Sequence, residues 1–186
     1  MTEIHIFSGL FSSIVPQFRK GTEDLTKRVN DLPGGGTAQH HIWVTWRLVA
    51  KRLVAKHKTG ELDGPVILGG HSNGTLAARK IADALSKHGV IVDYEFSIDP
   101  TIFWFPKVNH NVERHDEIHA TSGISAVFRW LTRGWSGKVH YVDDWKGERF
   151  FLRREVGHVA IPSHPDVHER IVEQIGETLD RGESEH

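Results

Sequence analysis

The sequence predicts an α/β fold, a three-layer sandwich in which helices cover both faces of a five-stranded, mainly parallel sheet. Short apolar runs rich in β-branched residues alternate along the chain with segments whose apolar residues recur at helical spacing, and this alternation is typical of parallel sheets. The 186 residues suit one domain with a sizeable core, and no repeat or linker divides them. We therefore expect a single domain over residues 1–180, followed by a polar tail over residues 181–186.

The expected elements follow from these patterns. The strands are Glu3–Phe7, Thr37–Ile42, Pro65–His71, Val90–Ile98 and Lys138–Val142. The inward faces of the helices are predicted to carry Phe18, Thr22, Leu25 and Val29; Trp46, Val49, Ala50, Leu53 and Val54; Ala77, Ile81, Ala84, Leu85 and His88; and Val167, Ile171, Ile175 and Leu179. Gly60 and Gly89 predict the ends of the second and third helices. The second helix also has a basic face, which we expect to be solvated: Arg47, Lys51, Arg52, Lys56 and Lys58.

Composition narrows the functions that the chain can have. Hydrophobic residues make up 38% and charged residues 25%, and the formal net charge of −1 gives no general attraction to nucleic acid or to acidic membranes. The absence of cysteine excludes disulfides, thiol catalysis and thiolate zinc sites. The N-terminus lacks a signal-peptide pattern and no apolar run is long enough to span a bilayer, so we expect a cytoplasmic protein without stable membrane insertion.

One motif organises the chain, Gly70-His71-Ser72-Asn73-Gly74, a Gly-x-Ser-x-Gly pattern between the third strand and a helix. A strand that turns sharply into a helix strains its central serine, and side chains two residues to either side would collide, so glycine fits positions 70 and 74. The turn presents the Ser72 hydroxyl and directs the Asn73 backbone N–H towards an anion forming beside it. Ser72 is therefore predicted to be a nucleophile, with a phosphate-binding turn as the alternative.

A serine hydroxyl needs a base to take its proton and an acid to orient that base. Asp99 follows the fourth expected strand, and His158 lies in a loop after the last one, so the chain order is serine, aspartate, histidine. All three residues would lie at the carboxyl ends of strands, where open α/β sheets place their sites.

These segments resemble the α/β-hydrolase superfamily, and in particular its small lipase- and esterase-like serine hydrolases. The residues that carry the resemblance are the Gly70–Gly74 elbow, Asp99-Pro100-Thr101 and Gly157-His158-Val159, and it covers the chain from the first strand to the final helix. An Asp-Pro pair after the fourth strand is similar to hydrolases of the pancreatic-lipase type, whereas many family members place the acid one strand later. Asp143 or Asp144 could therefore be the acid instead, and His140 or His164 could be the base.

The resemblance implies an arrangement and a mechanism. The chain lacks the family's N-terminal hairpin, so the spatial strand order would be 2-1-3-4-5. Residues 8–11 would be the oxyanion loop, in which a backbone N–H of Leu10 or Phe11 joins that of Asn73, although no His-Gly-Gly-Gly signature is present. Ser72 would attack a small-molecule acyl ester or thioester and form an acyl-enzyme, with no cofactor and no metal; the oligomeric state stays open.

Three further interpretations accompany this one. The aromatic-rich segment over residues 101–136 is either a cover over an acyl pocket, such as a lid, or ordinary core. His115 and His119, with His110 nearby, would suit a metallohydrolase only if their segment is helical, and surface histidines explain them more simply. Finally, a hydrolase fold can serve as a non-catalytic binding or scaffold protein.

Overall fold

The computed structural model of the chain describes residues 2–13, 15–33, 37–100, 108–120, 149–151 and 156–184. Within these ranges six parallel strands form one sheet in the order β2-β1-β3-β4-β5-β6. The strands are β1 (Glu3–Ser8), β2 (Thr37–Ile42), β3 (Val66–His71), β4 (Tyr94–Ile98), β5 (His115–His119) and β6 (Arg149–Phe151). The predicted α/β class is confirmed. β1 to β4 correspond to the first four expected strands, whereas β5 and β6 were not predicted.

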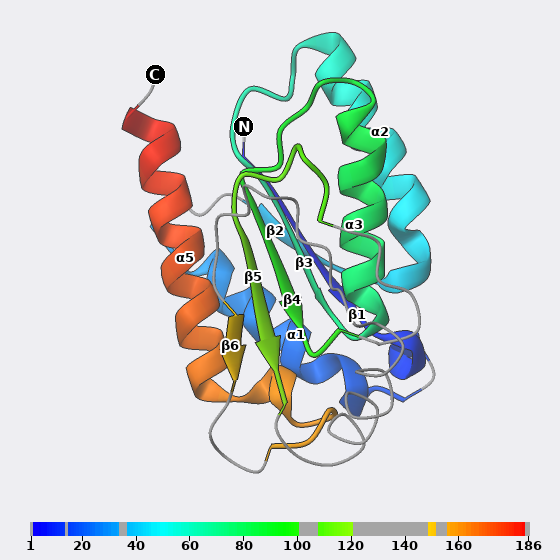
Figure 1. The fold of residues 1–186 in the computed structure, drawn as a ribbon, viewed down its shortest axis with the longest axis vertical. Helices are drawn as coiled ribbons and strands as arrows, with labels where there is room; N and C mark the ends of the chain where they lie inside the picture. Colours follow the sequence, from blue (N-terminus) through cyan, green and yellow to red (C-terminus); the bar gives the residue numbers. More distant parts are fainter. Residues whose placement is uncertain are drawn as a thin grey trace.

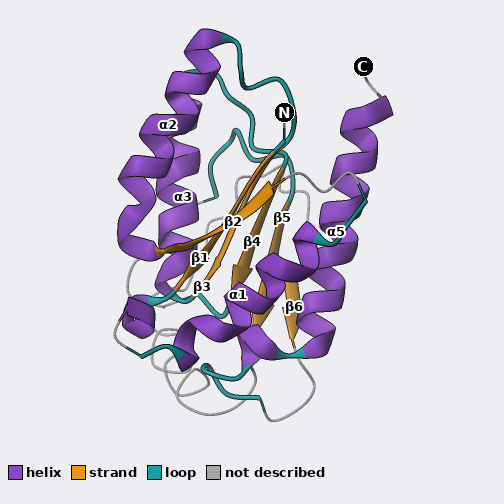
Figure 2. Cartoon of the chain, turned by 180° about the vertical axis from the view of Figure 1, so that it is seen from behind, coloured by secondary structure: helices purple, strands orange, loops and turns teal. Residues whose placement is uncertain are grey.

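Helices cover both faces of the sheet (Figures 1 and 2). They are α1 (Gln17–Asn30), α2 (Trp46–Thr59), α3 (Asn73–Ser86) and α5 (Pro165–Ser184), with short 3-10 helices η1 (Leu10–Ser13), η2 (Trp43–Thr45) and η3 (Ile161–Ser163). One apolar cluster joins α2 and α3 to the sheet, and a second joins α1 and α5 to its other face. Figure 2 shows the face that α1 and α5 cover. No helix in the described ranges is both long and apolar enough to cross a bilayer.

The alternation of side chains along β1 explains the three layers. Ile4 and Ile6 belong to the cluster under α1 and α5, whereas Phe7 belongs to the cluster under α2 and α3, and all three are fully buried. A strand that is apolar on both faces must be covered on both faces. The inward positions predicted for α5 are all buried, as is Leu53 of α2.

Glycine ends two of the helices as predicted. Gly60 and Gly89 have positive φ angles of 74° and 72°, a backbone conformation that glycine adopts without a steric penalty. The N–H groups of Gly89 and Val90 bond to the carbonyls of Ser86 and Leu85 and close α3. Since α3 ends at Ser86, His88 is exposed, and its predicted place on the inward face was wrong.

Several elements differ from the expectation. β1 ends at Ser8 instead of Phe7, and β3 begins at Val66 instead of Pro65. β4 begins at Tyr94 instead of residue 90, because the preceding chain forms only an isolated bridge, between Val92 and Val112. The place beside β4 is taken by β5, which lies within the segment expected to be an aromatic-rich insert; residues 101–107 and 121–136 of that segment lie outside the described ranges. The expected strand Lys138–Val142 also lies outside them. Residues 181–184, expected to be tail, continue α5.

The topology brings three chain reversals to one end of the sheet. β1 and β3 are neighbours, as the predicted order requires, and β3 and β4 are neighbours too. All strands run towards the lower end of the view in Figure 1, so the residues that follow β1, β3 and β4 meet there. These residues are Gly9, Ser72 and Asp99.

Candidate active site

The turn between β3 and α3 holds Ser72 in a strained conformation. Its φ angle is 56° and its ψ angle −123°, a combination that L-residues rarely adopt. The Ser72 N–H bonds to the Ile98 carbonyl at 2.9 Å, and the Thr75 N–H bonds to the Ser72 carbonyl at 3.1 Å, so both sides of the turn are fixed.

Close backbone packing explains the two glycines of this elbow. A Cβ on Gly70 would lie 2.4 Å from the Gly74 carbonyl carbon, and a Cβ on Gly74 would lie 2.1 Å from the Phe7 carbonyl oxygen. The obstructing atoms belong to the backbone and cannot rotate away. The collision expected from the motif is therefore present in the structure, and it involves β1 as well as the elbow itself.

Ser72, His158 and Asp99 lie in a row. The Ser72 Oγ is 3.0 Å from Nε2 of His158, and Nδ1 of His158 is 2.7 Å from Oδ2 of Asp99. An ionised carboxylate can only accept, so Nδ1 carries the hydrogen and Nε2 presents its lone pair to the serine hydroxyl. This tautomer is the one that a general base acting on Ser72 requires.

The backbone and the side chain of Asp99 are each held by a hydrogen bond, one to β5 and one to the residue that follows β5. The Asp99 N–H bonds to the Ile118 carbonyl at 2.6 Å, and its Oδ1 accepts the Ala120 N–H at 3.1 Å. The φ angle of Asp99 is 40°, a left-handed conformation that aspartate tolerates better than most residues. One carboxylate oxygen is thus held by the Ala120 N–H, directly after β5, and the other faces His158.

His71 contacts His158 through a hydrogen bond and its ring, and it was not singled out by the sequence. Its Nε2 lies 2.9 Å from the His158 carbonyl oxygen, and the two rings are 4.6 Å apart. Because a carbonyl only accepts, Nε2 of His71 donates. Burial, aided by the neighbouring His158, lowers the pKa of His71 to about 3, so its ring stays neutral. The motif leaves this position unconstrained, so no sequence signal identified it.

The loop after β1 lies against the predicted nucleophile. A Cβ on Gly9 would be 3.0 Å from Ser72 Cβ and 3.4 Å from Ser72 Oγ, so only glycine lets the loop come this close. Leu10 begins η1, and Asn73 begins α3. The first N–H groups of a helix point outwards along its axis, which suits them to face an anion. The structure thus brings the predicted oxyanion segments to the same serine.

The rival base His164 is placed elsewhere. Its Nδ1 accepts the Asp166 N–H at the start of α5, while His158 occupies the position between Ser72 and Asp99. The rival base His140 and the rival acids Asp143 and Asp144 lie outside the described residues.

The metallohydrolase interpretation required His115 and His119 to lie on a helix, and the structure does not meet this condition. His115 and His119 lie on the strand β5 and not on a helix, and their partners are carboxylates: Glu95 and Glu117 for His115, and Glu117 for His119. In the part of the chain that the structure describes, no group of three or more histidine or acidic side chains is arranged to hold a metal ion.

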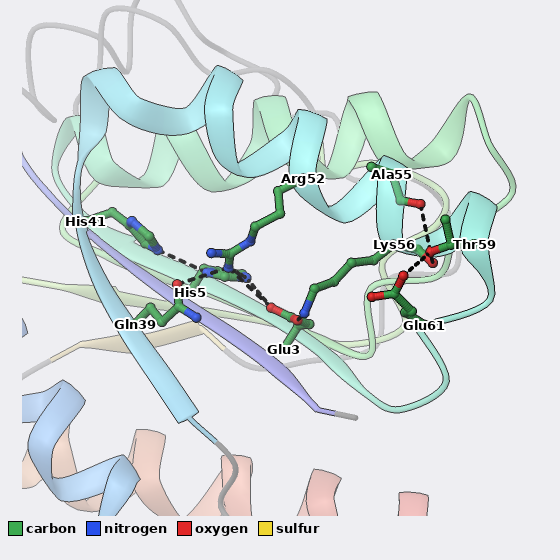
Figure 3. Close-up of polar contacts among 9 residues, drawn as sticks. All are labelled: Glu3, His5, Gln39, His41, Arg52, Ala55, Lys56, Thr59 and Glu61. Atoms are coloured by element: carbon green, nitrogen blue, oxygen red, sulfur yellow. Dashed lines mark hydrogen bonds and ion pairs between the residues drawn. The ribbon is translucent and has the colours of Figure 1, made fainter.

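The basic face of α2 is only partly solvated. Arg47, Lys51 and Lys58 are exposed, as expected. Arg52 is exposed as well, but it pairs with Glu3 and donates to Gln39 at 3.0 Å, and the half-buried Lys56 also reaches Glu3 (Figure 3). The reason is the buried carboxylate of Glu3 on β1, which needs cationic partners.

Comparisons with known proteins show which solved structures share this fold. No family model and no curated protein matches the chain. Among solved structures the chain is similar to Arabidopsis thaliana SOBER1, with 9% identity over 96% of this chain and 99% of that chain and a TM-score of 0.51. It is also similar to an esterase of Pyrobaculum calidifontis, with 13% identity over 97% of this chain and 76% of that chain and a TM-score of 0.50. The RedJ thioesterase of Streptomyces coelicolor is similar as well, with 12% identity over 96% of this chain and 90% of that chain and a TM-score of 0.50. The strained elbow on a parallel sheet and these likenesses lead to one conclusion: the chain has the α/β-hydrolase fold.

Proposed function

We propose that the protein is a serine hydrolase that cleaves an acyl ester or thioester through a covalent acyl-enzyme. The observation that carries the proposal is the position of His158, whose two ring nitrogens lie 3.0 Å from Ser72 Oγ and 2.7 Å from Asp99 Oδ2. A hydroxyl, an imidazole and a carboxylate in this order form the arrangement that activates a serine.

The chemistry follows from this order. Nε2 of His158 takes the Ser72 proton as Oγ attacks the substrate carbonyl carbon, and Asp99 stabilises the imidazolium that results. The backbone N–H of Asn73, joined by that of Leu10 or Phe11, is the proposed donor set for the oxyanion. The imidazolium then protonates the leaving alcohol or thiol, and a water molecule, activated by the same histidine, releases the acyl group as an acid and restores Ser72.

Two further observations support this reaction class. The solved structures named above include an esterase and a thioesterase, both of which act on acyl carbonyls. In addition, backbone strain of the kind seen at Ser72 costs about 1–3 kcal/mol and is concentrated at functional sites. A purely structural turn has no need of it, which disfavours a non-catalytic scaffold.

A panel of acyl esters and thioesters of graded chain length tests the proposal. Wild type should hydrolyse at least one member, and Ser72→Ala should lose several orders of magnitude of turnover, because the members of a triad act as a unit. Ser86→Ala, which removes an exposed hydroxyl from α3, is the matched control and should keep wild-type turnover. Equal activity of Ser72→Ala and wild type would contradict the proposal.

A further inference from the structure

Two buried serines lie under the loop that approaches Ser72. Ser8 ends β1 and is fully buried, and Ser12 lies in η1 with 1% of its surface exposed. The Ser12 Oγ is 2.6 Å from the Gly9 carbonyl oxygen, and the Ser8 Oγ is 2.7 Å from the Ser12 Oγ. The two hydroxyls therefore form a chain of hydrogen bonds that ends on the backbone of the loop.

The direction of these hydrogen bonds is fixed by their last member. The Gly9 carbonyl can only accept, so the single hydroxyl hydrogen of Ser12 is directed to it. The Ser12 oxygen must then accept from Ser8, whose hydroxyl has the His41 carbonyl at 3.2 Å as its second acceptor. Hydrogen bonds in such a chain polarise and strengthen one another.

The Gly9 carbonyl belongs to the same peptide unit as the Leu10 N–H. This peptide bond is trans and planar, so its C=O and its N–H point in opposite directions. The Ser12 hydroxyl and the Ser12 N–H, at 2.6 and 3.3 Å, hold the carbonyl on one side. The Leu10 N–H is thereby held on the other side of a peptide that begins at Gly9, where an added Cβ would lie 3.0 Å from Ser72 Cβ.

We propose that Ser12, supported by Ser8, is a positioning residue for the oxyanion hole: it fixes the Gly9–Leu10 peptide so that the Leu10 N–H faces the anion formed at Ser72. This inference rests on the proposed hydrolase function. It distinguishes Leu10 from Phe11 as the second donor, which the sequence left open. It also gives a role to the buried hydroxyls of Ser8, at the end of β1, and Ser12, in η1, which would otherwise add only stability.

The test compares Ser12→Ala and Ser12→Thr with wild type, using p-nitrophenyl butyrate and a trifluoromethyl ketone of matching chain length. The ketone forms a hemiketal with the serine whose oxyanion occupies the hole, whereas KM for the ester reports binding outside it. Removal of an oxyanion donor costs about 100- to 1,000-fold in kcat, so a donor that is only loosened should cost about 10- to 100-fold.

Ser12→Ala is therefore expected to lower kcat and the affinity for the ketone by similar factors with little change in KM, and Ser12→Thr, which keeps the hydroxyl, should restore both. Thr26→Val on α1 also deletes a buried hydroxyl that bonds to a backbone carbonyl, that of Thr22, and controls for lost stability without an effect on kcat. If Ser12→Ala does not fold, Ser12→Cys, with similar volume and a weak donor, takes its place.

The outcomes separate the two proposals. A wild type that neither hydrolyses an ester nor binds the ketone refutes the hydrolase function itself. An active wild type whose Ser12→Ala variant keeps kcat and ketone affinity overturns only the role of Ser12, and the same holds if KM rises while kcat is unchanged.

Discussion

Ser72 and Asp99 are the two non-glycine residues with positive φ angles in the described part of the chain. Each stands directly after the last residue of a strand, and the two strands, β3 and β4, are neighbours. A sharp reversal at these two positions turns both side chains towards His158 instead of along the sheet. Local strain at two residues thus places the hydroxyl and the carboxylate on either side of one imidazole.

The role of Asp99 can be tested by an isosteric change. Asn tolerates a positive φ angle and its amide oxygen can still accept the Ala120 N–H, so Asp99→Asn should fold normally. It cannot fix the His158 tautomer or stabilise the imidazolium, so ester turnover should fall by about 1,000- to 10,000-fold. Steady-state kinetics measure the loss, with the exposed Asp83→Asn as the control. Full activity in Asp99→Asn together with none in Asp143→Asn or Asp144→Asn would assign the acid to the later aspartates.

At the scale of elements, the elbow depends on how closely β1 passes beneath α3. A Cβ on Gly74 would meet the Phe7 carbonyl oxygen at 2.1 Å, so Gly74→Ala requires one of the two backbones to move. We expect a loss of about 3 kcal/mol or more in the free energy of unfolding, at the upper end for overpacked sites. Urea denaturation measures it.

Gly176→Ala on α5 is the matched control. Nothing lies within 4 Å of a Cβ built there, so the alanine meets no neighbour and should raise the free energy of unfolding by about 0.5–1 kcal/mol through its higher helix propensity. Equal stability of Gly74→Ala and wild type would show that the elbow is not as tight as these distances indicate.

The elements that the sequence predicted are those whose signal is local. Gly70, Ser72 and Gly74 form a recognisable five-residue motif, although Gly74 also packs against Phe7 of β1, and the boundaries of Thr37–Ile42 were predicted without error. β5 was missed because its burial depends on charges from other elements. On one face Arg79 pairs with Glu117 and Glu95, each at 3.3 Å, and on the other the Tyr94 hydroxyl donates to Asp116. A strand buried by ion pairs has no apolar periodicity to reveal it.

Part of the candidate site could likewise be predicted from the sequence. Ser72, Asp99 and His158 lie in the order and at the strand ends that the pattern indicated. Gly9 and His71 contact residues far away in the sequence, Ser72 and His158, and such contacts leave no mark on the surrounding sequence. Ser12 bonds within its own loop, but no motif marks that loop.

At the scale of the whole molecule, three parallel strands and one late loop assemble the site. β1 delivers Gly9, β3 delivers Ser72, β4 delivers Asp99, and His158 arrives after β6. Further along β1 in the N-terminal direction, the same sheet buries a second polar cluster, in which His5 lies between Glu3 and His41 at 3.0 Å from each. Figure 3 shows this cluster beneath α2, and it ties α2 to the sheet by charge as well as by apolar packing.

This cluster predicts how stability depends on pH. The hydrogen bond from His5, together with Lys56 and against the opposing effect of burial, lowers the pKa of Glu3 from its ordinary 4.5 to about 2. A carboxyl with a lowered folded pKa stabilises the fold above its ordinary pKa, and this stability is lost as the pH falls from 4.5 towards 2. Glu3→Gln should therefore be less stable than wild type at neutral pH and should lose less stability over that interval.

Urea denaturation at a series of pH values measures this difference. Burial also lowers the pKa values of His5 and His41, the latter to about 4, so their protonation keeps some acid sensitivity in the variant. Glu169→Gln, an exposed carboxylate of α5, is the control. If the free energy of unfolding changed with pH in the same way for Glu3→Gln and wild type, the Glu3 carboxylate would contribute nothing to the pH dependence of stability.

The central claim is that Ser72 is a covalent nucleophile, and the mass of the intact protein after incubation with a fluorophosphonate tests it most directly. The reagent phosphonylates an activated serine, so it identifies the nucleophile even when the substrate is unknown. Wild type should carry one adduct, located on Ser72 by peptide mapping, and a folded Ser72→Ala variant should carry none. A folded wild type that stays unlabelled, or a Ser72→Ala variant that labels as fast as wild type, would contradict it.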